Sequence, residues 1–357
     1  MNAPLPPTAW TTGTTEVFKT GTWRAALPRH LARPSPCHQA CPVNGEIATW
    51  IGHARDGHLK RAWEVLTLNN PFPAISGRIC HHPCESACNR SAHDEALAVC
   101  ALERAVGDAA LAAGWQFAAR DAAGGGHAAI VGGGPSGLSA AYQLRRRGWR
   151  VTLYERQPRL GGLMRHGIPA YRLAREVLDG EVDRILALGI EVRVQALDAT
   201  AIEGLRGSHD AVYLATGAAR SKRLPQLPAS APWLMQGSEY LARCSEGDTP
   251  SLGRSIVVVG GGSAAMDVAR SARRAGCAVT VLALEPRERM PAPCSHWRTA
   301  TSGWRPTRSW WPSARTPTST SRRACLHQAA CSASTNTRPR PGRDSGPVAT
   351  WPAWRAS

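Results

Sequence analysis

Apolar residues in the first third of the chain recur every three or four positions, which is the spacing of one helix face. From Gly45 to Asn70 this pattern predicts two helices with a break at Asp56-Gly57. A further helix fits Asp94 to Ala113. The apolar face of the first two helices consists of Ile47, Trp50, Ile51, Ala54, Leu59, Ala62, Trp63 and Leu66. The first 115 residues are therefore expected to contain a small helical unit.

At His127 the pattern changes to short apolar runs that alternate with amphipathic stretches. Such an alternation predicts parallel strands joined by helices. The expected strands lie at 128–131, 150–155, 211–215, 255–259 and 278–283, and a helix is expected at 173–188. These changes divide the chain into an irregular arm (1–36), a helical domain (37–125), two α/β domains (126–232 and 233–292) and a tail (293–357).

The tail breaks every pattern. It contains one Leu, one Val and no Ile, but six Trp. Such a composition cannot bury a core, so we expect disorder. It is also what a GC-rich gene yields when read out of frame. We hypothesise that residues from 293 onward are a frameshift product; an uninterrupted reading frame on resequencing would contradict this.

The formal net charge of +17 would ordinarily indicate a nucleic acid or another anionic partner. However, ten Arg residues and a single acidic residue lie in the tail. Elsewhere the longest basic run is Arg145-Arg146-Arg147, on a predicted helix surface. Without a nucleic-acid-binding motif, this charge does not favour a nucleic-acid partner.

The cysteines indicate metal or redox chemistry. Residues 1–30 lack the apolar core of a secretory signal, and no stretch approaches the 18 apolar residues of a membrane span. We therefore expect a cytoplasmic protein. Eleven cysteines in such a chain point to metal or redox use rather than to disulfides.

The first Gly-rich loop is Gly132-Gly133-Gly134-Pro135-Ser136-Gly137, which follows a strand and opens a helix. Gly132 permits the tight turn, Gly134 the approach of a pyrophosphate, and Gly137 close packing of helix on strand. Glu155 ends the next strand, 18 residues past Gly137, where it can accept hydrogen bonds from a ribose. The alternative is a Gly-rich turn without a ligand.

The second loop is Gly260-Gly261-Gly262-Ser263-Ala264-Ala265, with Ala in place of the third Gly. Glu285 lies 20 residues past Ala265. Its carboxylate suits the ribose hydroxyls of NADH and repels the extra phosphate of NADPH, whereas Arg287 and Arg289 could reverse this preference. Glu285 as an ordinary surface acid remains the alternative.

Two such loops imply two dinucleotides, and one is usually a flavin if a nicotinamide is to reduce it. The stretch from Asp210 to Gly217, with Ala215-Thr216-Gly217, resembles a strand and turn of flavoprotein reductases that bind two dinucleotides.

Five cysteines form a candidate cluster site, namely Cys37, Cys41, Cys80, Cys84 and Cys88. The Cys41-Pro42 pair and the short spacings are typical of ferredoxin-like runs that bind a [4Fe–4S] cluster. Five thiolates suffice for one such cluster. Zinc, which more often uses a C-x2-C pair, and the absence of any metal remain alternatives. His81 and His82 are expected to be loop residues, and Cys100 to pack inside a helix.

Taken together, these motifs resemble the small (beta) subunit of glutamate synthase and its relatives, including the N-terminal part of dihydropyrimidine dehydrogenase. The resemblance covers residues 14–292 and both Gly-rich loops. It also rests on the motifs at 20–24, 37–42, 70–73, 77–90 and 161–169, the last being Gly-Gly-Leu-Met-Arg-His-Gly-Ile-Pro.

The resemblance implies a helical cluster-binding domain ahead of a split FAD domain, with a nicotinamide domain inserted into it. Hydride passes from NAD(P)H to FAD, and single electrons leave through clusters to a partner subunit. Gly162, Leu163, Thr216 and Gly217 then join the first loop as FAD contacts. No side-chain acid or base is required, because catalysis is mostly positioning of the two cofactors.

The sequence departs from this family in three respects. Two-cluster relatives carry an extra cysteine pair where this chain has Arg29 and Ala32, so one cluster is expected. In those relatives a residue near Glu103 can complete a cluster, which makes Glu103 a further candidate. NADPH-linked relatives carry two arginines in place of Leu284-Glu285, which favours NADH. Beyond Ala292 the rest of both α/β domains, with a Gly-Gly-Asp turn, is not recognisable, so both are expected to be incomplete.

The leading interpretation is an oxidoreductase subunit that transfers electrons from NAD(P)H through FAD and one [4Fe–4S] cluster to a protein acceptor or a larger catalytic subunit. The alternative is an inactive remnant that keeps only a cluster-binding or partner-binding module.

Overall fold

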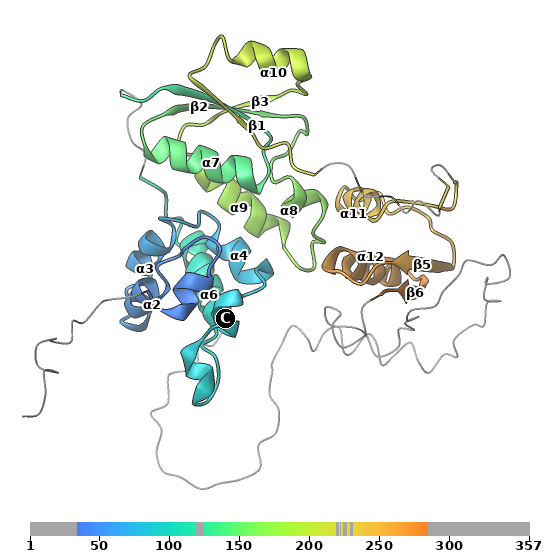
Figure 1. Cartoon of the computed structure of the whole chain (residues 1–357), viewed down its shortest axis with the longest axis horizontal. Helices are drawn as coiled ribbons and strands as arrows, with labels where there is room; N and C mark the ends of the chain where they lie inside the picture. Colours follow the sequence, from blue (N-terminus) through green and yellow to red (C-terminus); the bar gives the residue numbers. More distant parts are fainter. Residues whose placement is uncertain are drawn as a thin grey trace, which may run out of the picture. The chain divides into compact units, whose positions relative to one another are not determined.

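In a computed structural model of the chain, the described residues are 34–118, 124–218, 221, 223, 227–228 and 231–284 (Figure 1). Residues 1–33 of the expected arm, the tail 293–357, Glu285 and Arg287 lie outside these ranges. The part that is described begins with helices and continues with two parallel α/β units, as the apolar pattern predicts.

The N-terminal region consists of short helices around one apolar core. They are α1 (Pro36–Ala40), α2 (Ile47–Arg55), α3 (Leu59–Leu66), α4 (Pro73–Ile79), α5 (Pro83–Ser86), the 3-10 helix η3 (Asn89–Ala92) and α6 (Val99–Ala112). Trp50 and Trp63 are almost fully buried in this core, and the other predicted face residues except Leu59 also pack in it. Leu59, the first residue of α3, is 39% exposed, so its place on the apolar face was predicted wrongly. The helix expected from Asp94 begins only at Val99. The short helices α4 and α5, which the apolar pattern did not predict, each begin with a proline, the residue best suited to a first helical position.

The first α/β unit is a four-stranded parallel sheet in the order β3-β2-β1-β4. Its elements are β1 (His127–Val131), α7 (Pro135–Arg146), β2 (Arg150–Glu155), α8 (Leu163–His166), α9 (Arg175–Leu186), β3 (Glu191–Val194), α10 (Ala199–Leu205) and β4 (Ala211–Leu214). Ile130 of β1 faces α7 and α9, whereas its neighbours Ala129 and Val131 face Leu205 of α10 (Figure 1). Both faces of the sheet are therefore covered, which explains why the central strand β1 is apolar at every position from Ala128 to Val131.

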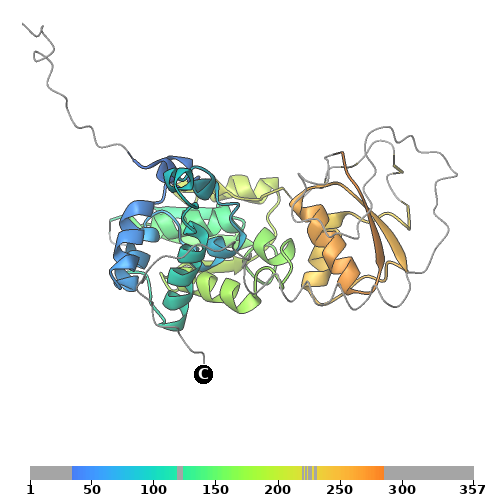
Figure 2. The same ribbon diagram turned by 90° about the horizontal axis from the view of Figure 1, so that it is seen from below.

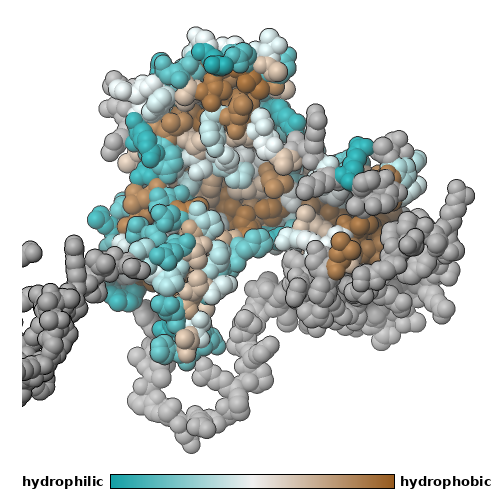
Figure 3. Space-filling model, viewed as in Figure 1, coloured by the Kyte–Doolittle hydropathy of each residue, from teal (hydrophilic) through white to brown (hydrophobic). Residues whose placement is uncertain are grey.

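The second α/β unit is smaller. It contains α11 (Gly237–Ser245), β5 (Ser255–Val259), α12 (Ser263–Arg274) and β6 (Ala278–Leu282). The two strands pair in parallel, and α12 lies along one face of them (Figure 2). Val257 and Val259 of β5 are each 54% exposed. Figure 3 shows hydrophobic residues on the visible face of this unit. Among the described residues, no further strand covers this side.

The helical region and the first α/β unit share one apolar core. Phe72 and Ile75, from the start of α4, pack in the same cluster as Leu138 of α7 and Leu178 of α9. The hydroxyl of Tyr142 on α7 donates a buried hydrogen bond of 2.6 Å to the carbonyl of Thr67. These two parts of the chain therefore fold against each other.

A buried carboxyl group lies inside this shared core. Glu181 of α9 is fully buried, and its Oε2 accepts the backbone N–H of Ile75 at 3.2 Å. Burial raises its pKa to about 8, although the backbone N–H groups of Ala74 and Ile75 and the charge of Arg184 oppose the shift. The charge of Glu103 on α6 adds to the rise.

This raised pKa predicts a pH dependence of stability. Because the folded chain keeps the proton on Glu181 and the unfolded chain releases it above about pH 4.5, stability should fall as pH rises from there to about 8. The slope from this group is at most about 1.4 kcal/mol per pH unit. Urea titrations from pH 5 to 9 should show a gentler fall for Glu181→Gln than for the parent chain. Parallel curves would contradict the prediction.

Candidate functional site

The first Gly-rich loop is shaped by backbone contacts that exclude side chains. Gly132 has a φ of +112°, and its N–H donates to the carbonyl of Tyr154 on β2 at 2.8 Å. A Cβ on Gly132 would lie 2.3 Å from the carbonyl oxygen of Ala215. A Cβ on Gly137 would lie 1.8 Å from the carbonyl oxygen of Gly132. The structure therefore requires glycine at both positions.

The loop leads into a helix whose N-terminus is accessible. Gly134 is the N-cap of α7, and Pro135 occupies the first helical position. Pro135 and Ser136 are exposed, so the free N–H groups of the first turn can reach a ligand. The hydroxyl groups of Ser136 and Tyr213 lie 2.9 Å apart. This end of α7 suits an anion such as a pyrophosphate.

Glu155 is held against the loop. Its Oε2 accepts the N–H of Gly133 at 2.7 Å, and its Oε1 accepts the N–H of Gln157 at 2.9 Å. The acid at the end of β2 thus binds the loop's own backbone, a contact that the motif did not predict. A carboxylate has about four lone-pair positions, so it keeps acceptor capacity for a ribose. The ribose contact stays a prediction.

The second glycine pair of the first α/β unit packs on the same loop. The N–H of Gly161 donates to the carbonyl of Gly133 at 2.8 Å. A Cβ on Gly162, which has a φ of +50°, would lie 2.7 Å from the Cα of Gly134. The structure therefore brings Gly162 to the first loop, and it leaves Leu163, at the start of α8, 69% exposed.

The turn after β4 also lies beside this loop. The N–H of Ala215 donates to the carbonyl of Val131 on β1 at 2.8 Å. Thr216 and Gly217 follow directly, and Gly217 has a φ of +68°. The residues expected to contact FAD thus gather where β1, β2 and β4 end, which is where parallel α/β sheets bind ligands.

The second loop has the same course with looser packing. Gly260 has a φ of +124°, its N–H donates to the carbonyl of Leu282 at 2.7 Å, and Gly262 is the N-cap of α12. A Cβ on Gly260 would lie 3.6 Å from the Cβ of Ala265, an ordinary contact. Ala265 therefore fits where the first loop requires Gly137. Ser263 and Ala264 form the accessible first turn of α12.

A buried acid that the Gly-rich motif does not include, Asp267, lies one turn after Ser263 on α12. Asp267 is only 3% exposed, and its Oδ2 pairs with Arg172 at 2.5 Å. Burial raises the pKa of this carboxyl, and Arg172 opposes the rise. Its Oδ1 is buried with no hydrogen-bond partner among the described residues. The sequence did contain a sign of this acid, because helical spacing places Asp267 on the apolar face of α12, where a carboxyl group is unusual.

Three of the five candidate cluster cysteines, Cys41, Cys80 and Cys84, lie close enough together for their charges to interact. Burial raises the pKa of the Cys84 thiol to about 11, and the charges of Cys41 and Cys80 add to the rise. Cys37 and Cys41 pack against the helical core that contains Cys84. Cys88, which is not buried, has its pKa lowered, chiefly by the N–H of Leu97.

Backbone N–H groups point at two of the sulfurs. The N–H of His82 donates to Sγ of Cys80 at 3.4 Å, and that of Leu97 to Sγ of Cys88 at 3.5 Å. His82 reaches this position with a φ of +53°. Hydrogen bonds to sulfur are a feature of iron–sulfur sites. These N–H groups are of the kind that a bound cluster uses, and ligation by the five cysteines stays a prediction. Among the described residues, no group of His, Cys, Asp and Glu is arranged to hold a single metal ion.

Glu103 and Cys100 have structural partners. Oε1 of Glu103 accepts hydrogen bonds from Asn70 at 2.6 Å and Ser76 at 2.8 Å, and burial raises its pKa. Its role as a cluster ligand stays a prediction. The thiol of Cys100 donates to the carbonyl of Gly77 at 3.0 Å, and burial raises its pKa to about 12. Packing of Cys100 inside a helix is confirmed.

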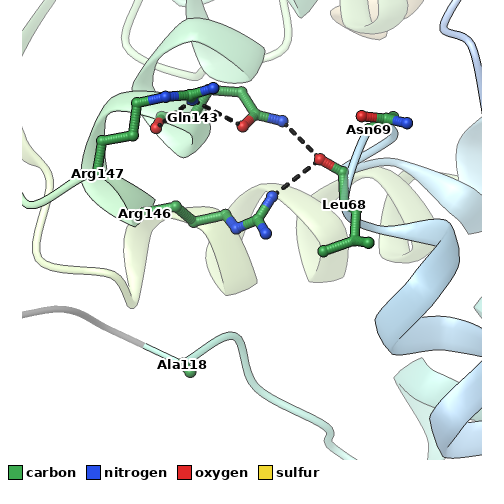
Figure 4. A pocket seen from close by; sticks show the side chains of 6 residues that line it. All are labelled: Leu68, Asn69, Ala118, Gln143, Arg146 and Arg147. Carbon is green, nitrogen blue, oxygen red and sulfur yellow. Dashed lines mark hydrogen bonds between the residues drawn. The ribbon is translucent and has the colours of Figure 1, made fainter. Parts of the chain in front are cut away.

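A cavity of about 600 Å³ lies at the other end of α7, away from the Gly-rich loop (Figure 4). It is lined by Leu68, Asn69, Ala118, Gln143, Arg146 and Arg147. Gln143 and Arg146 both donate to the carbonyl of Leu68. These two hydrogen bonds connect α7 to the helical region. The lining of the cavity includes no residue of either Gly-rich loop. None of the helices described here is long and apolar enough to cross a membrane.

Two domain families match this chain. Residues 30–115 match the family described as dihydropyrimidine dehydrogenase domain II, 4Fe–4S cluster. Residues 126–300 match the family described as pyridine nucleotide-disulphide oxidoreductase.

Three curated relatives illustrate the similarity. The NADP(+)-dependent formate dehydrogenase subunit beta of Moorella thermoacetica is 35% identical, over 74% of this chain and 42% of the relative. The NAD-dependent dihydropyrimidine dehydrogenase subunit PreT of Salmonella typhimurium is 33% identical, over 73% and 65%. The glutamate synthase [NADPH] small chain of Mycobacterium tuberculosis is 34% identical, over 72% and 55%. The chain thus spans between 42% and 65% of the length of these relatives.

Proposed function

Because residues 30–115 belong to the dihydropyrimidine dehydrogenase 4Fe–4S domain family and residues 126–300 to the pyridine nucleotide-disulphide oxidoreductases, we propose that this chain is an electron-transfer subunit. It takes hydride from NAD(P)H onto FAD and passes electrons through one [4Fe–4S] cluster to a protein partner. The observation that carries this proposal is that one chain has two Gly-rich loops, each leading into a helix, and a group of thiols in its helical region. The first loop has a backbone that admits no side chain at Gly132 or Gly137.

The chain's own residues would bind and orient the two dinucleotides. The first turn of α7 presents free N–H groups to a pyrophosphate, and Glu155 stiffens the loop by accepting the N–H of Gly133. The first turn of α12 does the same for a nicotinamide nucleotide. A bound flavin would supply the step from two-electron to one-electron chemistry. No side-chain acid or base is needed, since the protein's contribution is positioning.

The cluster would be held by Cys41, Cys80 and Cys84, with Cys37 or Cys88 as the remaining thiolate. The location of these thiols supports this assignment, because Cys84 lies close enough to Cys41 and Cys80 for their charges to act on it, and Cys37 and Cys41 pack against the core that contains Cys84. The N–H groups directed at Cys80 and Cys88 would stabilise charge on the sulfurs.

The electrons would leave to a protein partner, either an acceptor or a larger catalytic subunit. The names of the relatives support this part of the proposal, since each is a subunit or chain of a named enzyme. A cytoplasmic location accords with eight free cysteines among the described residues.

We expect NADH to be the preferred donor. The carboxylate of Glu285 would repel the additional phosphate of NADPH, and a tenfold difference in kcat/KM corresponds to about 1.4 kcal/mol. Stopped-flow bleaching of the flavin by each nucleotide measures the preference. Glu285→Gln should reduce the discrimination, and Arg287→Gln should increase it. Equal rates for NADH and NADPH in the parent chain would contradict this assignment.

Anaerobic expression with iron and FAD tests the proposal as a whole. A brown and yellow protein that bleaches with NADH supports an electron-transfer enzyme. The second candidate function is an inactive remnant that keeps a binding module. It is supported by the exposure of three apolar strand residues, Val257, Val259 and Leu214. A colourless, insoluble product would favour the remnant, because uncovered strands promote association.

A further inference from the structure

We infer that Glu181 is a positioning residue that connects the flavin-binding region to the cluster-bearing helix. From α9 of the first α/β unit, its carboxyl group holds the start of α4, the helix that ends at Cys80. The effect of Glu181 on a cluster rests on the proposed function, whereas the hydrogen bond between Glu181 and Ile75 is present in the structure.

Glu181 supplies a hydrogen-bond acceptor at the N-terminus of α4, where the first backbone N–H groups have no acceptor within the helix. Pro73 occupies the first helical position and has no N–H, so Ala74 and Ile75 carry the first free backbone donors. The carboxyl of Glu181 accepts the N–H of Ile75, with Oε2 at 3.2 Å from the nitrogen, and the N–H of Ala74 lies near enough to lower the pKa of this carboxyl. Phe72, the N-cap residue, makes no side-chain cap of its own. A residue more than a hundred positions away therefore supplies the cap.

Helix α4 transmits this position to Cys80. Its C-cap is Cys80, whose N–H donates to the carbonyl of Ser76 at 2.9 Å. A helix of this length spans about 10 Å, so the cap and the thiol are one short rigid element apart. If the start of α4 moved, the sulfur of Cys80 would move with it.

Two glycines clamp α4 onto α6, so the two helices behave as one body. A Cβ on Gly107 of α6 would lie 2.3 Å from the nitrogen of Ala74. A Cβ on Gly77 of α4 would lie 2.4 Å from the nitrogen of Arg104. The backbones therefore touch without intervening side chains.

The segment with Cys84 is tied to the same body. Oε1 of Glu85, which follows Cys84 on α5, accepts the N–H of Cys100 at 2.8 Å, at the start of α6. Both the Cys80 and the Cys84 segments are thus connected through α4 and α6 to Glu181. The flavin-binding region would in this way set the place of two cluster ligands.

The carboxyl of Glu181 is fully buried next to Arg184, which in turn packs on two aromatic rings. Arg184, which is 4% exposed, lies with Nη1 at 3.4 Å from Oε1 of Glu181. Its guanidinium lies over the ring of Trp63 at 5.3 Å and over that of Phe117 at 5.9 Å. These rings stack on each other with centroids 5.1 Å apart. This dense packing leaves the carboxyl of Glu181 little room to move away from the start of α4.

Three variants and a matched control test the inference. Glu181→Ala removes the acceptor, Glu181→Gln keeps an acceptor oxygen, and Glu181→Asp keeps the carboxyl but withdraws it by one methylene. Glu176→Gln changes an exposed acid on the same helix and is the control. Amide exchange of Ala74, Ile75 and Ser76 is measured on cluster-free full-length protein. After cluster loading, the EPR spectrum and the rate of iron loss to a chelator are recorded.

Glu181→Ala should raise exchange at Ala74 and Ile75 at least about tenfold, a loss of about 1.4 kcal/mol of local stability. It should also broaden the EPR signal and speed iron loss, while Glu181→Gln restores parent behaviour and Glu176→Gln changes nothing. If Glu181→Ala does not fold, Glu181→Asp should show the same changes in milder form.

Parent-like exchange and EPR spectra in both Glu181→Ala and Glu181→Asp would overturn the inference. Equal effects in Glu176→Gln would also overturn it, because they would indicate general loosening of α9. Failure of the parent chain to take up a cluster would instead refute the proposed function, and the exchange data would still decide whether Glu181 anchors α4.

Discussion

Replacing Gly137 by alanine is expected to abolish FAD binding and to destabilise the first α/β unit by about 3 kcal/mol or more, the upper range for overpacking. The new Cβ would lie 1.8 Å from the carbonyl oxygen of Gly132, which is backbone and cannot rotate away. Helix α7 would have to move off β1, and its first-turn N–H groups would leave the loop. Flavin content from visible absorbance and urea unfolding at fixed pH measure the two effects.

Two other substitutions separate folding from binding. Gly134→Ala adds a Cβ that would lie 3.7 Å from the Cα of Gly162, an ordinary contact. It should cost only about 1 kcal/mol, because Gly134 is the N-cap of α7 and alanine is a poor N-cap. It should still weaken FAD binding, because the methyl group blocks the approach of the pyrophosphate. Ala265→Gly in the second loop should cost about 1 kcal/mol of helix propensity and spare the flavin. If Gly137→Ala bound FAD as the parent does, the first loop would not be the flavin site.

Replacing Cys84 by serine is expected to remove the cluster. Cys84 is buried beside Cys41 and Cys80, and a neutral hydroxyl cannot take the place of a thiolate. Iron content should fall from about four atoms per chain to near zero, with loss of the brown absorbance. Iron analysis and absorbance after anaerobic reconstitution provide the measurement.

Cys100→Ser is the matched control, since Cys100 is equally buried but donates its thiol proton to the carbonyl of Gly77. A serine hydroxyl can make the same hydrogen bond, so this variant should retain its iron. A Cys84→Ser protein with full iron content would exclude Cys84 as a ligand. Cys37→Ser and Cys88→Ser, compared in the same way, would identify the remaining thiolate.

Local sequence patterns were sufficient for the elements that are long or strongly periodic. The buried faces of α2 and α3, with Trp50 and Trp63, follow from helical spacing alone. The strands β1 and β5 follow from short apolar runs before Gly-rich loops, and β2 and β6 follow as the second strands of the two expected strand–helix–strand units. The short elements α4, α5, α10 and β3 were not predicted, because four to seven residues carry too little periodicity.

The sequence by itself determined the two Gly-rich loops, the family resemblance and the set of candidate thiols, because these depend on residue types at fixed local spacing. Only the tertiary structure decided why Gly137 cannot be alanine while position 265 is alanine, since that depends on the distance to another backbone segment. It also decided that Glu155 binds Gly133 and that Glu181 caps α4. Such contacts join residues far apart in the chain, and local patterns carry no information about where a buried carboxyl will find its donors.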